Sequence, residues 1–169
     1  MNVLTANCNG GVAGVCWKVK LMALRTLGSD GGANSDIAEA FDYARRQGAK
    51  IINASHSGEG SSIMQTAVNT LESAGILLVA AVGNDDANLD SNPVYPAAYG
   101  NRNILSVGST DNRGVITDYS NFGRRTVDLA APGDSILSTL PHDSYGTKTG
   151  TSFSAPLVTG ACVLLKSHH

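Results

Sequence analysis

An apolar run between two glycines places the strongest constraint on the fold of this chain. Residues 76–82 read Ile-Leu-Leu-Val-Ala-Ala-Val, with Gly75 before them and Gly83 after them. A strand with one exposed face alternates apolar and polar residues, whereas a strand covered on both faces is apolar throughout. The run is also far shorter than the about 20 residues needed to cross a bilayer. It therefore predicts a buried strand in a sheet with layers on both sides.

Two segments before this run carry apolar residues at helical spacing, and they predict helices over residues 37–48 and 62–75. Gly48 and Gly75 are expected to end them, because glycine tolerates the left-handed conformation that follows many helices. The apolar stripe of the second helix consists of Ile63, Met64, Ala67, Val68 and Leu71. The expected caps are Ser35 or Asp36 for the first helix, and Ser62 with Gln65 at capping-box spacing for the second.

Short apolar runs elsewhere predict the remaining elements. Strands are expected at residues 18–27, 50–54, 104–108, 127–130 and 136–140, and a last helix from about Ser152 to the end of the chain. Alternation of strands and helices is typical of an α/β fold with a mainly parallel sheet. The 169 residues contain no internal repeat or linker, so we expect a single domain over residues 1–169.

Composition excludes several function classes. The formal net charge of −2 gives no electrostatic reason to bind nucleic acid, and no apolar stretch is long enough for a membrane span. The first residues lack the basic and apolar regions of a signal peptide. Three cysteines, Cys8, Cys16 and Cys162, occur without a Cys-x-x-Cys pair, which favours free thiols over disulfides or a zinc site.

Two polar residues stand at positions where chemistry is feasible. Ser152 lies at the expected start of the last helix, with Pro156 in its first turn, so an oxyanion beside it would feel the positive end of the helix dipole. Asn84 follows the buried strand, where its amide could donate to developing negative charge. Taken alone, each has a simpler interpretation: Ser152 as a helix cap and Asn84 as a turn residue.

The combination of segments resembles the subtilisin-like serine proteases. Residues 150–156 read Gly-Thr-Ser-Phe-Ser-Ala-Pro, with Val158 and Gly160 after them, and match the nucleophile motif except that Phe153 replaces the usual methionine. Further segments resemble other family signatures in the right order: residues 11–15 followed by 18–27, 51–55, 80–84, 95–97 and 130–133. The resemblance implies a three-layer fold with a central sheet flanked by helices, and a cis bond between Tyr95 and Pro96.

The same resemblance implies a role for each matching residue. Ser152 would be the nucleophile that forms an acyl-enzyme, and the Asn84 side chain with the Ser152 backbone N–H would form the oxyanion hole. The substrate-binding residues that it implies are Ser55, His56 and Ser57 on one edge, Gly31, Gly32 and Ala33 on the opposite edge, and Ala81, Val82 and Gly83 in the wall of the pocket for the residue before the scissile bond. The family usually has Leu-Gly-Gly where this chain has His56-Ser57-Gly58, which leaves substrate preference open.

The resemblance also implies an orienting Asp and a general-base His upstream of the serine, in that order. Neither motif occurs here, and none of His56, His142, His168 and His169 matches the base. We therefore expect an internal part of the catalytic domain, truncated at both ends, with its N-terminal part missing. The first hypothesis is a serine endopeptidase domain completed by the missing Asp and His. The alternative is an inactive subtilase-like module that binds extended peptides along residues 55–57.

Cofactors and partners follow from the same comparison. The chemistry needs no cofactor, and the implied partners are a polypeptide substrate and either a propeptide or the missing N-terminal segment. Residues 7–12 resemble the family's calcium loop, but Cys8 stands where an oxygen ligand is expected, so we expect no metal here. Four acidic residues are expected to be solvated or turn carboxylates: Asp30, Asp85, Asp86 and Asp128. Family members are commonly secreted or vesicular, although this sequence shows no signal peptide.

Overall fold

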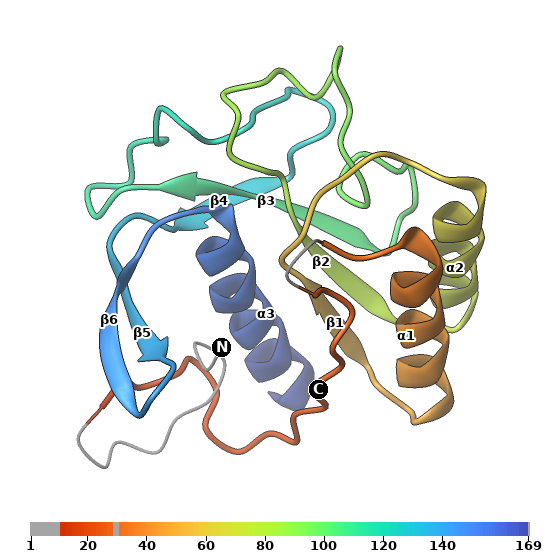
Figure 1. Cartoon of the computed structure of the whole chain (residues 1–169), viewed down its shortest axis with the longest axis horizontal. Helices are drawn as coiled ribbons and strands as arrows, with labels where there is room; N and C mark the ends of the chain where they lie inside the picture. Colours follow the sequence, from red (N-terminus) through yellow and green to blue (C-terminus); the bar gives the residue numbers. More distant parts are fainter. Residues whose placement is uncertain (1–10, 29–30, 169) are drawn as a thin grey trace.

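A four-stranded parallel sheet forms the centre of the molecule (Figure 1). The computed structural model describes residues 11–28 and 31–168. The strands are β1 (Ile51–Ala54), β2 (Leu77–Ala81), β3 (Ile104–Thr110) and β4 (Leu129–Pro132), and they lie side by side in that order. All neighbouring pairs are parallel. The predicted α/β fold with a mainly parallel sheet is confirmed.

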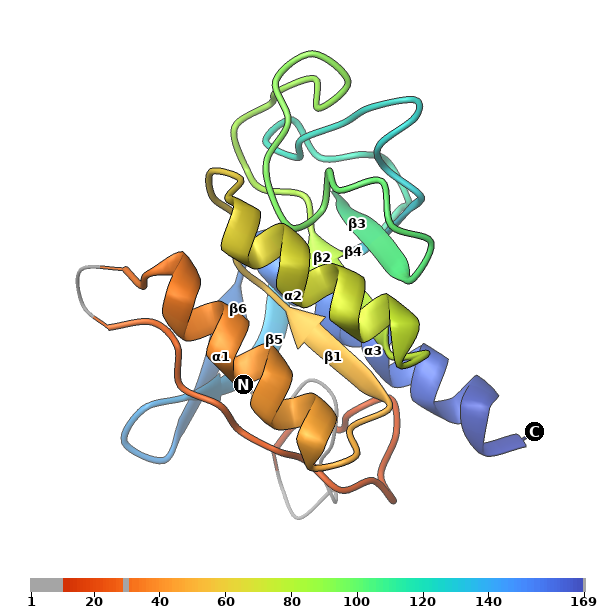
Figure 2. The same cartoon turned by 90° about the vertical axis from the view of Figure 1, so that its right-hand side faces the viewer.

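Helices cover both faces of this sheet (Figures 1 and 2). One layer holds α1 (Asn34–Arg46) and α2 (Ser62–Ser73), and the other holds α3 (Thr151–His168). Successive side chains of β2 point to opposite layers: Leu78 packs with α1 and α2, whereas Val79 packs with α3. Both are fully buried. This explains why the run between Gly75 and Gly83 has no polar residue, and it confirms the three-layer arrangement.

The observed N-caps lie one to three residues before the predicted ones. Ala33 is the N-cap of α1 and makes no side-chain cap, because alanine has no side-chain oxygen, and the helix begins at Asn34, before Ser35 and Asp36. Ser61, not Ser62, caps α2 by accepting a hydrogen bond from the Met64 N–H. Ser61 and Ser62 have the same side chain, but only Ser61 has the extended backbone that an N-cap requires, because Ser62 is already the first residue of the helix. Gly48 and Gly75 have positive φ angles of 79° and 66° and end the helices as expected.

Residues 18–27 do not form the predicted strand. The segment has no regular secondary structure and pairs with no strand within residues 11–28 and 31–168, and β1, at the edge of the sheet, pairs with β2 alone. A strand needs a neighbour, because its backbone N–H and C=O groups are otherwise left to solvent. The apolar side chains that suggested a strand are therefore exposed: Leu21 by 51%, Met22 by 43% and Leu24 by 38%.

An antiparallel hairpin follows the parallel sheet. Its first strand, β5 (Ile136–Leu140), was predicted, whereas its second, β6 (Ser144–Lys148), was missed. The residues of β6 read Ser-Tyr-Gly-Thr-Lys and lie on the surface, so they carry no apolar pattern. The turn between the strands contains His142 and Asp143, both with positive φ angles. Backbone pairing alone defines this strand.

The layered core leads to a prediction about stability. Leu71 of α2 is 1% exposed within the core shared by α1, α2 and the sheet, whereas Leu165 of α3 is 67% exposed. Leu71→Ala should lower the free energy of unfolding by about 2–5 kcal/mol, because it leaves a cavity in a packed interior. Leu165→Ala makes the same chemical change at the surface and should cost less than about 0.5 kcal/mol. Urea denaturation followed by circular dichroism measures both, and equal losses would contradict the assigned layers.

Candidate active site

Three polar residues meet at the carboxyl edge of the parallel sheet. Ser55 directly follows β1, Asn84 lies just beyond β2, and Ser152 lies in the first turn of α3. In open α/β sheets the carboxyl ends of the strands are where ligand sites form, because strand ends and helix N-termini converge there. The structure thus brings together the predicted nucleophile, the predicted oxyanion donor and one predicted substrate edge.

Ser152 and Ser55 are joined by two reciprocal hydrogen bonds. The Ser152 hydroxyl donates to the Ser55 carbonyl at 3.0 Å, and the Ser55 hydroxyl donates to the Ser152 carbonyl at 3.0 Å. The two residues are 97 positions apart in the chain. A hydroxyl has one proton, so the Ser152 O–H is directed at a backbone carbonyl and not at an imidazole.

Thr151 fixes the side chain of Asn84. The Thr151 N–H donates to Asn84 Oδ1 at 2.8 Å, and its hydroxyl lies 3.1 Å from the same oxygen. That hydroxyl also accepts from the Gly83 N–H at 3.2 Å. Asn84 Oδ1 is thereby fully engaged as an acceptor, which leaves the amide NH2 as the group that can donate to a ligand. Thr151 stands inside the nucleophile motif, but the resemblance implied no role for its side chain.

Asn121 holds the turn that carries Asn84, and sequence reasoning missed it. Its side chain donates to the Val82 carbonyl at 2.8 Å and accepts from the N–H groups of Asp85 and Ala87, both at 2.9 Å. Asn121 is 1% exposed, so these bonds lie in a protected environment. Gly83 makes this approach feasible: its φ is +98°, and a Cβ there would lie 2.6 Å from Asn121 Nδ2. Asn121 lies far from any recognised motif, so no local signal identified it.

The two predicted substrate edges line one cavity of about 340 Å³. Gly31 and Gly32 lie on one side, and His56 and Ser57 lie on the other. The remaining lining residues are Leu27, Asn34, Ile37, Gly58, Glu59, Met64 and Tyr95. Ala33 does not line this cavity, and neither do Ala81, Val82 and Gly83, which are buried. Their role as a pocket wall stays a prediction. The Tyr95–Pro96 bond is cis, as the resemblance implies.

His56 is an unusual wall residue because its imidazole is largely out of water. The ring lies 6.5 Å from that of Phe41, and Nε2 is buried with no hydrogen-bond partner in the described part of the chain. Burial lowers the pKa of His56 below the ordinary value for histidine, because the charged form is poorly solvated. The side chain is therefore neutral at pH 7.

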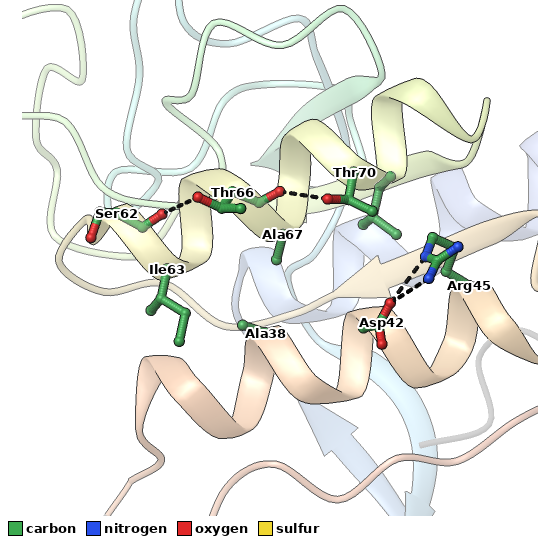
Figure 3. A pocket seen from close by; sticks show the side chains of 9 residues that line it. Ala38, Asp42, Arg45, Ser62, Ile63, Thr66, Ala67 and Thr70 are labelled. Carbon is green, nitrogen blue, oxygen red and sulfur yellow. Dashed lines mark hydrogen bonds and ion pairs between the residues drawn. The ribbon is translucent and has the colours of Figure 1, made fainter.

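A second hollow, of about 390 Å³, lies between α1 and α2 (Figure 3). Its two threonine hydroxyls are engaged in their own helix: Thr66 donates to the Ser62 carbonyl at 2.8 Å, and Thr70 donates to the Thr66 carbonyl at 2.9 Å. Ile63 lines this hollow and is 48% exposed, so the predicted apolar stripe of α2 is wrong at that residue. The helix is turned so that Met64, Val68 and Leu71 face the core. The hollow lies on the layer opposite α3 and has no connection to Ser152.

The structure describes only some of the residues to which the predictions about metal binding and free thiols refer. Within the described residues no group of three His, Cys, Asp or Glu side chains could hold a metal ion. Residues 7–10 of the calcium-like loop, with Cys8, and Asp30 lie outside the described residues. Asp128 accepts hydrogen bonds from the Ser106 N–H and hydroxyl at 2.8 and 2.7 Å.

Cys16 and Cys162 are free thiols, and burial raises the pKa of Cys162. Membrane insertion finds no support in the described helices, since each is too short or too polar to span a bilayer.

The family assignment follows from comparison with known proteins. The family model described as the subtilase family matches residues 3–169. The chain belongs to the subtilase family. It is 38% identical over 165 residues to the major intracellular serine protease of Bacillus subtilis, and 38% identical over 166 residues to subtilisin BL of Lederbergia lenta. These alignments cover 95% and 97% of this subtilase chain.

Solved structures give the same assignment. A protease from Pseudoalteromonas arctica superimposes with a TM-score of 0.89 at 34% identity, covering 98% of this subtilase and 56% of that chain. A cold-adapted subtilisin-like serine proteinase gives a TM-score of 0.84 at 29% identity, covering 92% and 56%. The chain spans 51% and 60% of the two curated relatives named above, so it corresponds to about half of their length.

The environment of His56 predicts a pH dependence of stability in this subtilase. Because the folded pKa is lowered, the unfolded chain binds more protons between the folded value and about 6.5, and stability falls as pH drops through that window. His56→Gln should make the free energy of unfolding less dependent on pH between pH 7.5 and 5. His142→Gln, which removes an exposed histidine, should leave the dependence in place. Urea denaturation across this pH range tests both variants. If the free energy of unfolding of His56→Gln changed with pH as steeply as in the unaltered chain, the lowered pKa of His56 would be contradicted.

Proposed function

We propose that this subtilase chain carries the nucleophile half of a serine endopeptidase, with Ser152 forming the acyl-enzyme. The observation that supports it best is the adjacency of the Ser152 hydroxyl, the first turn of α3 and the fixed Asn84 amide. A serine at a helix start is common. Here a side-chain amide is held beside it, so the Asn84 NH2 and the Ser152 N–H can together donate to one oxyanion. That pairing fits acyl transfer.

In the proposed mechanism, Ser152 Oγ attacks the carbonyl carbon of the scissile peptide bond while a general base removes its proton. The tetrahedral oxyanion accepts hydrogen bonds from the Asn84 NH2 and from the Ser152 N–H, which is free of intrahelical partners because first-turn amides have none. Collapse expels the amine, which takes a proton from the base, and leaves an ester on Ser152. Water then hydrolyses this ester with the help of the same base.

The base and its orienting acid are proposed to come from a segment beyond these residues, in the same chain or in a second one. Two features of the fold support this. The outer edge of β1 is unpaired in the described part of the chain, and a completing strand could pair with it. The exposed apolar side chains of residues 18–27 would be covered by the same addition.

Chemical labelling tests this completion. We expect a fluorophosphonate probe to leave the chain alone unlabelled and to label Ser152 when the segment that precedes the matching region in thermitase of Thermoactinomyces vulgaris is fused to it. Thermitase is 39% identical over 163 residues, and the match covers 56% of its length. Ser152→Ala is the control and should abolish labelling. A folded fusion that stays unlabelled, although it binds peptides in the cavity beside His56, would favour the peptide-binding module instead.

The oxyanion role of Asn84 predicts a loss of rate without a loss of substrate binding. In the completed protein, Asn84→Ala should lower kcat by about 10²–10³-fold, the size measured for the matching asparagine of subtilisin itself. The KM for a peptide substrate should change little, because the donor acts on charge that develops only in the transition state. Asn103→Ala serves as the control. Asn103 lies away from the site, and its side chain donates to the Ile76 carbonyl. A rise in KM at constant kcat would contradict this role.

A further inference from the structure

The carbonyl of Ser152 lacks its usual helical partner. In an α-helix each C=O accepts from the N–H four residues later, and the residue four positions after Ser152 is Pro156, which has no N–H. The proline ring also crowds that carbonyl. The backbone of the residue that carries the nucleophile is therefore left without the hydrogen bond that normally fixes a first-turn peptide.

The Ser55 hydroxyl supplies the missing donor, at 3.0 Å from the Ser152 carbonyl. Its own orientation is set in turn by Asn53, whose Nδ2 donates to Ser55 Oγ at 2.9 Å. Because this hydroxyl has one proton and already accepts from Asn53, its proton is available for the Ser152 carbonyl. The Ser152 hydroxyl closes the ring by donating to the Ser55 carbonyl.

Thr159 lies at the far end of this chain of hydrogen bonds. Its hydroxyl lies 3.0 Å from Asn53 Oδ1 and 2.9 Å from the Ala155 carbonyl, so its single proton can be donated to either acceptor. Thr159 is 4% exposed. It follows Ser152 by two helical turns and so lies on the same face of α3, towards the end of β1.

We propose that Thr159 and Asn53 are positioning residues for Ser152, acting through the Ser55 hydroxyl. The inference rests on the proposed role of Ser152 as nucleophile. Thr159 holds the Asn53 amide, Asn53 directs the Ser55 proton, and Ser55 fixes the peptide that Pro156 leaves unbonded. The nucleophile thus depends on a helix residue two turns away that touches neither Ser152 nor the substrate edge.

The carbonyl shift of Ser152 tests this relay in the chain as it stands. An HNCO spectrum reads the Ser152 ¹³C′ resonance through the N–H of Phe153. Ser55→Ala should move that resonance upfield, because the carbonyl loses its donor. Thr159→Val should move it in the same direction without touching Ser152, and Thr159→Ser should restore it.

Thr66→Val is the matched control, because Thr66 makes the same hydrogen bond to the carbonyl four residues earlier, in α2. It should leave the Ser152 resonance in place. Unmoved carbonyl resonances in α1 verify that each variant is folded. If Ser55→Ala leaves Ser152 unmoved, or if Thr159→Val does so in a folded chain, the relay is refuted. Should Thr159→Val not fold, Thr159→Ala against Thr159→Ser decides the same question.

A kinetic measurement connects the relay to chemistry. In the fluorophosphonate-reactive fusion, Thr159→Val should slow labelling of Ser152 about fivefold, the effect of one lost hydrogen bond, while peptide affinity is unchanged. Thr159→Ser should recover the rate. An unchanged rate in Thr159→Val would overturn the positioning role. A fusion that is never labelled would instead refute Ser152 as the nucleophile. The carbonyl shifts would still decide whether Thr159 and Asn53 act on the Ser152 peptide through Ser55.

Discussion

The packing of α3 across one face of the parallel sheet determines where the candidate active site lies. Val79 and Ala81 of β2 meet Ala155 and Val158 of α3, and this contact directs the first turn of the helix to the carboxyl ends of the strands. Parallel strands all end at the same edge, so the loops after β1 and β2 arrive at that turn as well. On the opposite face of β2, Leu78 packs against α1 and α2, and Ala80 packs against Leu89 and Ala97. Burial on both faces prevents a shift of the sheet register, because a shift would expose apolar side chains.

The hydrogen bonds that join the elements of the fold at this edge also hold the polar groups of the candidate site. Thr151 joins α3 to the loop after β2, and in doing so it occupies the acceptor of Asn84 and leaves the donor free. Ser55 replaces the helix hydrogen bond that Pro156 removes, and in doing so it holds the peptide of Ser152. Buried polar groups must find partners, and at this edge the partners include the residues proposed for catalysis. Substitutions at this edge are therefore expected to affect stability as well as the proposed reactivity.

Sequence reasoning succeeded where a pattern reflects local physics. The period of apolar residues located the strands and helices, and glycine marked where α1 and α2 end. Prediction from the sequence failed where a neighbouring strand decides whether a segment becomes a strand. Residues 18–27 have the composition of a strand but no neighbour to pair with, whereas β6 has no strand composition and is held by pairing with β5. The cap of α2 is Ser61 and not Ser62, since backbone conformation, not residue type, selects between adjacent serines.

The sequence by itself determined the family, the layered α/β architecture and the identity of Ser152 and Asn84 as the residues to examine, because motifs and apolar periods are local properties of the chain. The tertiary structure decided how those residues are held. Asn121, Thr151, Asn53 and Thr159 act across separations of 34 to 106 residues, which no local pattern records. Hydrogen bonds in a buried site depend on distance and direction in space, and these exist only once the strands and α3 have packed.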